Sequence, residues 1–232
     1  MSQPIERSLA MIQSLASLSE PDRKAVEDRC MWRRYKAQEQ IIDQFSESRD
    51  IFFVCEGLVR VVIFSMSGRE ISFDEIGRGG LFGELAAIDG EPRSANVVAL
   101  KETVVAILPQ DAFISALARY PDLALTTMKR MVKVIRENTD RIMDLSILGA
   151  NNRVMAELLR EARPGIRDDN TAKIKPIPIH SDMASRASTT RETVARVMSE
   201  MTKKGLVKRE RDALVVLDVE RLEDLVEEFK AV

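Results

Sequence analysis

The sequence has 232 residues, with 35 lysines and arginines against 37 aspartates and glutamates, so its formal net charge is −2. This length allows one or two domains, and a hydrophobic content of 45% is enough for a buried core. No apolar run approaches the roughly 20 residues of a membrane helix, and the N-terminal residues lack an apolar signal core. We therefore expect a cytoplasmic protein that does not enter a membrane.

The residues that most often carry metal or redox chemistry are scarce. Cys30 and Cys55 are too few and too far apart for a disulfide framework or an iron–sulfur ligand set, and we interpret them as buried small hydrophobic residues. His180 is the only histidine, so haem and catalytic metals would lack ligands, and we interpret it as a structural or phosphate-facing residue. We expect no metal, no resident cofactor and no enzymatic activity.

The first segment, to about residue 107, is expected to be mostly β-structure after a short helical start. Alternation along residues 70–76 places Ser72 and Asp74 on one face of a strand, and turn signals flank this strand at Ser65–Gly68 and 77–80. Many short strands at close spacing indicate a small barrel or roll, where a small ligand can bind. The expected strands span residues 58–64, 70–76, 96–100 and 103–108.

The run 83–95, GELAAIDGEPRSA, combines groups that suit a sugar-phosphate. Gly83 and Glu84 stand at an expected helix start, where backbone N–H groups and the positive end of the helix dipole attract anions. Arg93 adds a fork of donors that fits phosphate oxygens. A carboxylate repels phosphate, but Glu84 makes sense if the ligand also carries a hydroxyl group, as ribose does.

A single long helix is expected from Pro121 to about Leu148. Its seam residues are spaced 3, 4, 3, 4, 3, which favours pairing with a second copy of the same helix. Asn138 interrupts this seam and has two interpretations: it fixes the register of the dimer, or it binds a ligand base, together with Thr139. The seam residues are Met128, Met131, Ile135, Asn138, Ile142 and Leu145.

The third segment, from about residue 149, is expected to begin with a helix capped by Asn151 or Asn152, followed by a polar loop over residues 167–175. Two helices separated by the break 188–190 then form a helix-turn-helix, since apolar residues recur at i, i+3, i+4 and i+7 in the second. A hairpin about Arg211-Asp212 predicts a wing, and residues 219–229 a closing acidic helix. The buried face of the second helix comprises Val194, Val197, Met198 and Met201.

The second helix of this pair has the residues of a DNA-reading helix. Residues 180–211 hold eight basic and four acidic residues, a local charge of +4 in a chain of −2. Arg191 and Arg196 can each span O6 and N7 of a guanine, and Glu192 can accept a hydrogen bond from cytosine. Phosphate contacts are expected from the hydroxyl groups of Ser181, Thr190 and Thr193.

The whole chain resembles the Crp/Fnr family of bacterial transcription regulators. Phe82 to Ala87 and Pro92 to Ala95 are similar to the cyclic-nucleotide cassette F-G-E-[LI]-A…P-R-[SAT]-A, and Thr190 to Arg196 is similar to the R-E-T-V-x-R recognition helix. The resemblance implies an α+β chain of three parts: a β-roll cyclic-nucleotide-binding domain over 1–120, a dimerisation helix over 121–148, and a winged helix-turn-helix over 149–232.

The resemblance also implies roles and partners. Glu84 would bind the ribose 2′-hydroxyl and Arg93 the cyclic phosphate, while Asn138 and Thr139 would contact the base across a homodimer. The allosteric ligand is expected to be cAMP rather than cGMP. The output would be binding of double-stranded DNA at TGTGA-like half-sites, with RNA polymerase as a further partner. The remaining pocket residues would be Gly83, Leu85, Ser94, Ala95, Val61 and Phe73.

Three positions depart from the family pattern. Ser188 stands in the turn between the two helices where glycine is usual, Gly149 replaces a helix-capping Asp and is expected to loosen the helix junction, and no glycine precedes Asp50. Two alternatives stay open: a regulator that binds DNA constitutively or responds to another ligand, and an enzyme that hydrolyses the nucleotide. The scarcity of metal-ligand residues disfavours the enzyme.

Overall fold

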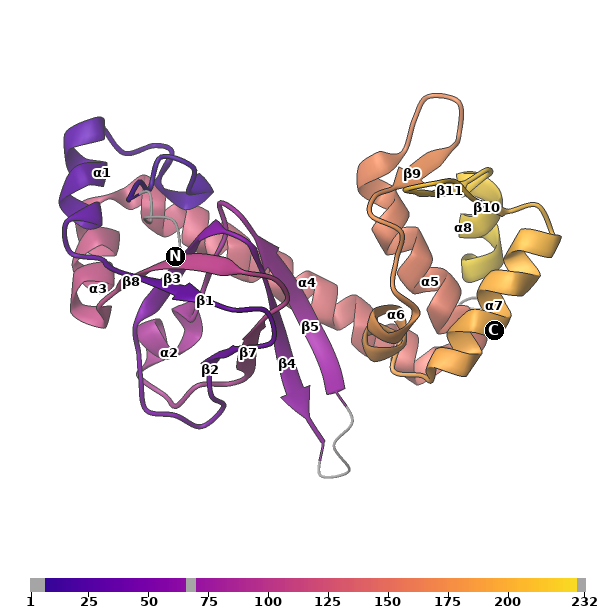
Figure 1. Ribbon diagram of the computed structural model, residues 1–232, viewed down its shortest axis with the longest axis horizontal. Helices are drawn as coiled ribbons and strands as arrows, with labels where there is room; N and C mark the ends of the chain where they lie inside the picture. The colour runs from indigo at the N-terminus through magenta and orange to yellow at the C-terminus, as the bar shows by residue number, and fades with distance from the viewer. Residues whose placement is uncertain (1–6, 66–69, 229–232) are drawn as a thin grey trace. The chain divides into compact units, whose positions relative to one another are not determined.

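The computed structural model of the chain describes residues 7–65 and 70–228 (Figure 1). The chain divides into two compact units, Met1–Ile135 and Arg136–Val232. This division falls inside the long helix, and the expected domain boundaries after residues 120 and 148 stay predictions. The expected turn at Ser65–Gly68 lies outside the described residues, except for Ser65. No helix in the described part of the chain is long and apolar enough to cross a membrane.

The first unit is built on two four-stranded antiparallel sheets, with strand orders β1-β8-β3-β6 and β2-β7-β4-β5. The four strands expected from the sequence correspond to β4, β5, β7 and β8, and the mixed α+β class is confirmed. The elements are η1 (Gln13–Leu15), α1 (Glu20–Glu27), β1 (Met31–Tyr35), β2 (Gln40–Ile42), β3 (Ile51–Glu56), β4 (Leu58–Phe64), β5 (Glu70–Gly77), β6 (Leu81–Phe82), α2 (Glu84–Asp89), β7 (Asn96–Ala99), β8 (Thr103–Leu108) and α3 (Gln110–Arg119).

The core of the first unit has two layers, one on each face of the β1-β8-β3-β6 sheet. On one face, Phe52 stacks on Phe82 with ring centroids 4.9 Å apart, and both pack against strands of the other sheet. On the opposite face, Phe53 packs against α1 and α3, which Figure 1 shows beside the strands. Because successive side chains of a strand point to opposite faces, the apolar run of β3 fills both layers.

A β-bulge between Val61 and Val62 corrects the strand faces expected from the sequence. Val61 pairs with Asp74, whereas its neighbour Val62 pairs with Ser72, so one residue of β5 is extra. Directly paired residues share a face of the sheet, so Asp74 and Ser72 lie on opposite faces. The expectation that they share a face was therefore wrong: Asp74 lies on the inner face with Val61, which packs in the roll interior.

The long helix α4 (Pro121–Ile147) confirms the helix expected from Pro121. Five apolar residues form an exposed stripe along it at spacings of 3, 4, 3 and 7, and Ile135 is 63% exposed. Met131 and Asn138 of the expected seam are half-buried, and Val132, the residue after Met131, is exposed in its place. The stripe comprises Leu125, Met128, Val132, Ile135 and Ile142.

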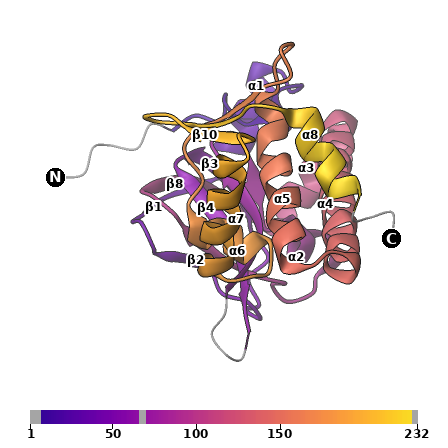
Figure 2. The same cartoon turned by 90° about the vertical axis from the view of Figure 1, so that its right-hand side faces the viewer.

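The second unit packs helices around a three-stranded sheet of order β10-β11-β9. Its core includes the fully buried side chains of Leu158, Met183, Val194 and Leu222. Figure 2 shows α8 alongside α5, where Val226 packs in a small apolar cluster. The elements are α5 (Ala150–Ala162), η2 (Arg163–Gly165), β9 (Ala172–Ile174), α6 (His180–Arg186), α7 (Arg191–Lys203), β10 (Val207–Arg209), β11 (Leu214–Val216) and α8 (Val219–Glu227).

Two expectations for the second unit were wrong in detail. The polar loop over residues 167–175 contains strand β9, which pairs with β11 and widens the predicted wing hairpin to three strands. Helix α5 is not capped by Asn151 or Asn152: Gly149 is its N-cap, and no side chain caps the helix. The helix starts at Ala150, and the side-chain oxygen of Asn151 accepts a hydrogen bond from Arg196 instead of capping the helix.

Candidate functional site

The glycines of the run 83–95 have backbone conformations that other residues rarely adopt. Gly83 has φ +88° as the N-cap of α2, and Gly90 has φ +76° at its end. A Cβ atom at position 83 would lie 2.8 Å from Nη1 of Arg93 and 2.9 Å from the carbonyl oxygen of Asp50. Gly83 is therefore needed both for the turn and for the close approach of Arg93.

Arg93 is fixed in place by its own hydrogen bonds and is 3% exposed. Its Nε donates to Ser48 Oγ at 3.1 Å, and its Nη1 and Nη2 donate to the carbonyl oxygens of Gly83 and Asp50 at 2.9 and 2.7 Å. A guanidinium has five N–H groups, so these three bonds leave two donors for a ligand. Burial lowers the pKa of Arg93 from its ordinary value, against the opposing effects of Asp50 and Glu84.

Glu84 lies in the first turn of α2 and is 8% exposed. Nε of Arg130, from α4, lies 3.5 Å from Glu84 Oε1, and Nη2 of the same arginine lies 3.2 Å from Asp74 Oδ2. The first unit thus brings together the buried carboxylate of Glu84, the buried guanidinium of Arg93 and the ion pair between Arg130 and Asp74. Both Arg130 and Asp74 were missed from the sequence alone, because neither belongs to a motif. In addition, Asp74 was assigned to the same strand face as Ser72, so its inward position was not expected.

For the remaining pocket residues expected from the sequence, the structure gives exposure and packing, and their contact with a ligand stays a prediction. Leu85 and Ser94 are exposed at α2 and in the segment before β7, whereas Ala95 and Phe73 are half-buried. Val61 packs against the interior of the roll. Asn138 and Thr139 belong to the second unit, so their contact with a ligand held by the roll stays a prediction.

The helix-turn-helix matches the sequence expectation closely. Thr190 is the N-cap of α7, and its hydroxyl accepts a hydrogen bond from the backbone N–H of Thr193 at 3.3 Å, as predicted. The backbone N–H of Glu192 and the hydroxyl of Thr190 hold the pKa of the Glu192 carboxyl below its ordinary value. Ser188 has φ +48°, so it adopts in the turn the left-handed conformation that favours glycine.

The predicted DNA-reading side chains are exposed together on α7. Arg191, Glu192 and Arg196 point away from the buried face of the helix, and Ser181 is exposed in α6. Arg196 is also held from outside the motif, because its Nη2 donates to Oδ1 of Asn151 at 2.8 Å. The sequence suggested a different role for Asn151, that of a helix cap.

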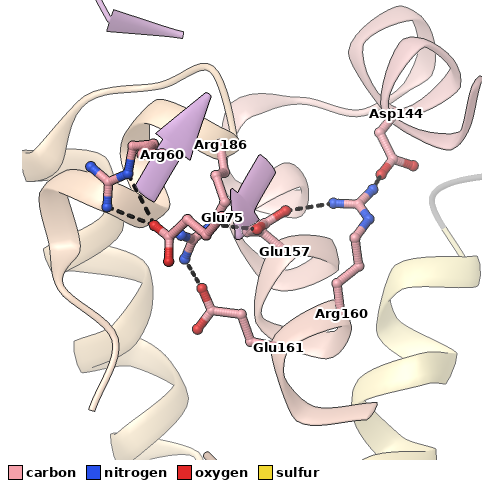
Figure 3. A network of polar contacts seen from close by, with 7 residues as sticks. All are labelled: Arg60, Glu75, Asp144, Glu157, Arg160, Glu161 and Arg186. Carbon is pink, nitrogen blue, oxygen red and sulfur yellow. Dashed lines mark hydrogen bonds and ion pairs between the residues drawn. The ribbon is translucent and has the colours of Figure 1, made fainter. Parts of the chain in front are cut away.

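A buried network of charges connects three helices of the second unit, α4, α5 and α6 (Figure 3). Glu157 of α5 accepts from Arg186 Nε at 2.7 Å and from Arg160 Nη1 at 2.8 Å. Arg160 also pairs with Asp144 of α4, and Arg186, the last residue of α6, also pairs with Glu161. The ends of α4 and α6 are thereby held to α5.

A second set of bonds joins the start of α5 to the helix-turn-helix. Arg153 donates from Nη1 to the carbonyl oxygen of Leu148 at 2.8 Å. It also donates from Nε to the carbonyl oxygen of Ala187 and from Nη2 to that of Ser188, at 2.9 and 3.0 Å. One side chain thus links the residue after α4 with the turn before α7.

The roll holds a separate ion pair, which Figure 3 also shows. Arg60 of β4 donates from Nε and Nη2 to Oε1 of Glu75, the residue opposite it in β5, at 3.0 and 2.7 Å. This pair lies on the other face of the sheet from Val61 and Asp74, so it stabilises the two strands and does not line the candidate pocket. Among residues 7–65 and 70–228, no group of three His, Cys, Asp or Glu side chains could hold a metal ion.

Comparisons with known proteins agree with both halves of this arrangement. The family model for the cyclic nucleotide-binding domain matches residues 32–120, and that for the Crp-like helix-turn-helix domain matches residues 152–225. The Cyclic AMP receptor protein of Thermus thermophilus is 28% identical over 83% of this chain and 87% of that protein. The cAMP-activated global transcriptional regulator Vfr of Pseudomonas aeruginosa is 27% identical over 81% of this chain and 89% of that protein.

Solved structures share the fold. A mutant of CooA from Carboxydothermus hydrogenoformans has a TM-score of 0.81 at 19% identity, over 97% of this chain and 98% of that chain. FixK2 from Bradyrhizobium japonicum has a TM-score of 0.70 at 20% identity, over 84% of this chain and 96% of that chain. With its cyclic-nucleotide-binding domain and its helix-turn-helix, this chain belongs to the Crp/Fnr family of DNA-binding transcription regulators, which are not enzymes.

Proposed function

We propose that this chain is a homodimeric, cytoplasmic transcription regulator whose DNA binding is switched by a cyclic nucleotide, with cAMP preferred over cGMP. The observation that carries the proposal is Arg93, a buried guanidinium held by backbone carbonyl groups with two donors left over, next to the buried carboxylate of Glu84. Similar proteins named for cAMP in Thermus thermophilus and Pseudomonas aeruginosa support the choice of nucleotide.

Each part of the nucleotide has a candidate partner. The cyclic phosphate accepts hydrogen bonds from the two remaining N–H groups of Arg93. Because the Arg93 side chain is already fixed, binding costs little conformational entropy there. The ribose 2′-hydroxyl donates to Glu84, a carboxylate that only accepts hydrogen bonds. The base reaches Asn138 and Thr139 of α4, whose amide and hydroxyl groups both donate and accept.

The proposed dimer forms along the exposed apolar stripe of α4. A helix that leaves Met128, Val132 and Ile135 exposed at spacings of 4 and 3 has the pattern of a coiled-coil seam without its partner. Replacing Ile135 with glutamate should convert the dimer to monomer in sedimentation analysis. A monomeric wild type would contradict the homodimer.

The proposed switch passes from the roll through α4 to the helix-turn-helix. Nucleotide bound to α4 favours one arrangement of residues Leu148 to Ala150, and this arrangement places two copies of α7 roughly 34 Å apart, as successive major grooves require. Each tenfold preference of the nucleotide for the DNA-binding state shifts the equilibrium by about 1.4 kcal/mol. Arg191, Glu192 and Arg196 then read TGTGA-like half-sites, and RNA polymerase is the proposed partner of the bound dimer.

Calorimetry with cAMP and cGMP tests the pocket. Arg93→Ala should abolish measurable binding, whereas Arg119→Ala, which removes an exposed arginine of α3, should not change it. Glu84→Gln provides a test that keeps the fold: it should weaken cAMP binding about 10- to 100-fold but have little effect on 2′-deoxy-cAMP, because the hydrogen bond it removes is absent there. Equal losses for both nucleotides would refute the role of Glu84.

DNA binding by the wild type tests the output. At one fixed salt concentration, cAMP should strengthen binding to a palindrome of two TGTGA half-sites and leave binding to a scrambled duplex weak. Equal affinity for the two duplexes would refute the proposed half-site. Strong binding to the palindrome that neither cyclic nucleotide alters would favour a constitutive or other-ligand regulator.

A further inference from the structure

The hydrogen bond between Arg196 and Asn151 joins the DNA-reading face to a helix outside the helix-turn-helix. Arg196 lies on the exposed face of α7, and Asn151 lies in the first turn of α5, 45 residues earlier in the chain. The distance from Arg196 Nη2 to Asn151 Oδ1 is 2.8 Å, which is normal for a hydrogen bond. An exposed arginine therefore has a defined partner in the DNA-free protein.

This bond leaves the arginine able to bind DNA. A guanidinium has five N–H groups, so the bond to Asn151 leaves four donors for other partners. Two of them are enough for the paired contact with O6 and N7 of a guanine. Arginine otherwise loses much rotamer freedom when it binds, and a side chain that is already oriented loses less.

Asn151 is itself on a well-fixed part of the structure. It is half-buried, and two residues later Arg153 binds the carbonyl oxygens of Leu148, Ala187 and Ser188. Because Ala187 and Ser188 lie in the turn before α7, the same turn of α5 is tied to the segment that leads into the recognition helix. The acceptor for Arg196 is thus held in register with the helix that carries Arg196.

We infer that Asn151 is a positioning residue for DNA recognition: it holds the guanidinium of Arg196 in the orientation that reads a guanine, and so contributes to sequence specificity. The inference rests on the proposed function, in which Arg196 contacts the operator. The opposite role is that Asn151 withdraws Arg196 from DNA. The two roles differ in sign, because removal of a positioning acceptor weakens specific binding and removal of a competing acceptor strengthens it.

Selection from a pool of random duplexes tests the inference without assuming an operator. Wild type, Asn151→Ala, Arg196→Ala and the neighbouring control Asn152→Ala are each used for selection with cAMP present. The wild type and the control should select the same palindrome, and Arg196→Ala should lose the preference for one guanine in each half-site. Asn151→Ala should show a weaker preference at that same guanine and no other change.

Binding of the wild-type palindrome and of a scrambled duplex gives the magnitude. Asn151→Ala should bind the palindrome about three- to tenfold more weakly, the usual effect of one lost hydrogen bond, with the scrambled duplex unchanged within about twofold. In the Arg196→Ala background, Asn151→Ala should have no further effect. An equal loss on both duplexes indicates a merely structural role and overturns the inference.

Two other results also overturn it. Unchanged or tighter binding by Asn151→Ala would show that the bond is idle or competes with DNA, while the proposed function would stand because Arg196→Ala still loses its guanine. A wild type that selects no common sequence would refute the proposed function and the inference together. The thermal midpoint of Asn151→Ala should match that of Asn152→Ala, which separates lost recognition from lost stability.

Discussion

Replacing Glu157 with alanine should destabilise the second unit strongly. Glu157 is 2% exposed and accepts hydrogen bonds from two arginines, at 2.7 and 2.8 Å. A hydrogen bond to a charged group contributes about 1.5–3 kcal/mol, so loss of both gives about 3–6 kcal/mol. Arg160 keeps Asp144 and Arg186 keeps Glu161, so neither cation is left unpaired, and we expect a loss near the lower limit, about 3 kcal/mol.

The assay can separate the two units within one chain. The single tryptophan, Trp32, lies in β1 and its fluorescence reports unfolding of the first unit, whereas far-UV circular dichroism also follows the helices of the second. With urea slopes of about 1–3 kcal/mol per M, a loss of 3 kcal/mol lowers the midpoint of the second unit by about 1–3 M. The urea midpoint of the first unit, followed by Trp32 fluorescence, should change much less than that of the second unit.

Two variants control this prediction. Glu157→Gln keeps the shape of the side chain and one acceptor oxygen, so its loss of unfolding free energy should be about half that of the alanine variant. Glu227→Ala removes an exposed carboxylate at the end of α8 and should leave the midpoint unchanged. Surface substitutions usually change the free energy of unfolding by no more than about 0.5 kcal/mol. If the free energies of unfolding of Glu157→Ala and Glu227→Ala differ by no more than this, the network does not stabilise the unit and the reasoning fails.

Gly83→Ala should destabilise the first unit by about 1–3 kcal/mol and weaken cAMP binding at least tenfold, because it forces a strained φ and displaces Arg93; an unaltered melting midpoint and calorimetric titration would contradict this. Ser188→Gly should raise the urea midpoint by the equivalent of about 0.5–1 kcal/mol, since relief of a left-handed serine exceeds the entropy cost of glycine, and a lower midpoint would oppose it. Burial raises the pKa of Cys30 to about 12 and of Cys55 to about 11, from an ordinary 9.0. These shifts stabilise the fold fully below about pH 9 and progressively less up to the folded-state values, so the urea midpoint should fall as the pH rises from 8 to 10.5, more than in a Cys30→Ala, Cys55→Ala variant. Both thiols should resist iodoacetamide at pH 8.5 until urea is added, and rapid alkylation of the native protein would refute the assigned burial.

Features that depend on neighbours in the chain could be predicted from the sequence. The cap at Thr190 and the buried face that begins at Val194 follow from local spacing, because one helical turn brings these residues together. The turn at Gly83 and the helix that follows it were predictable for the same reason. In each case the partner lies within about one or two turns along the sequence.

Features that depend on distant partners could not be predicted. Ile174 of β9 pairs with Leu214, which lies 40 residues later, and a three-residue strand is too short to show a period of its own. The bulge near Val61 inserts one residue that alternation cannot register. Arg130 reaches Glu84 from a different element, and the helical pattern of α4 gives its charge no special meaning.

The contacts of α5 bear on the flexibility expected of the junction between α4 and α5 at Gly149. A glycine at this junction was expected to loosen it, since glycine has wide backbone freedom. However, Arg153 bridges the junction by donating to Leu148, and farther along α5 Arg160 pairs with the buried Asp144 of α4. Two separate attachments therefore restrain the junction that one flexible residue would leave free. A displacement of the end of α4 would be passed to α5 as a whole, and through Asn151 to the side chain that we propose reads the DNA.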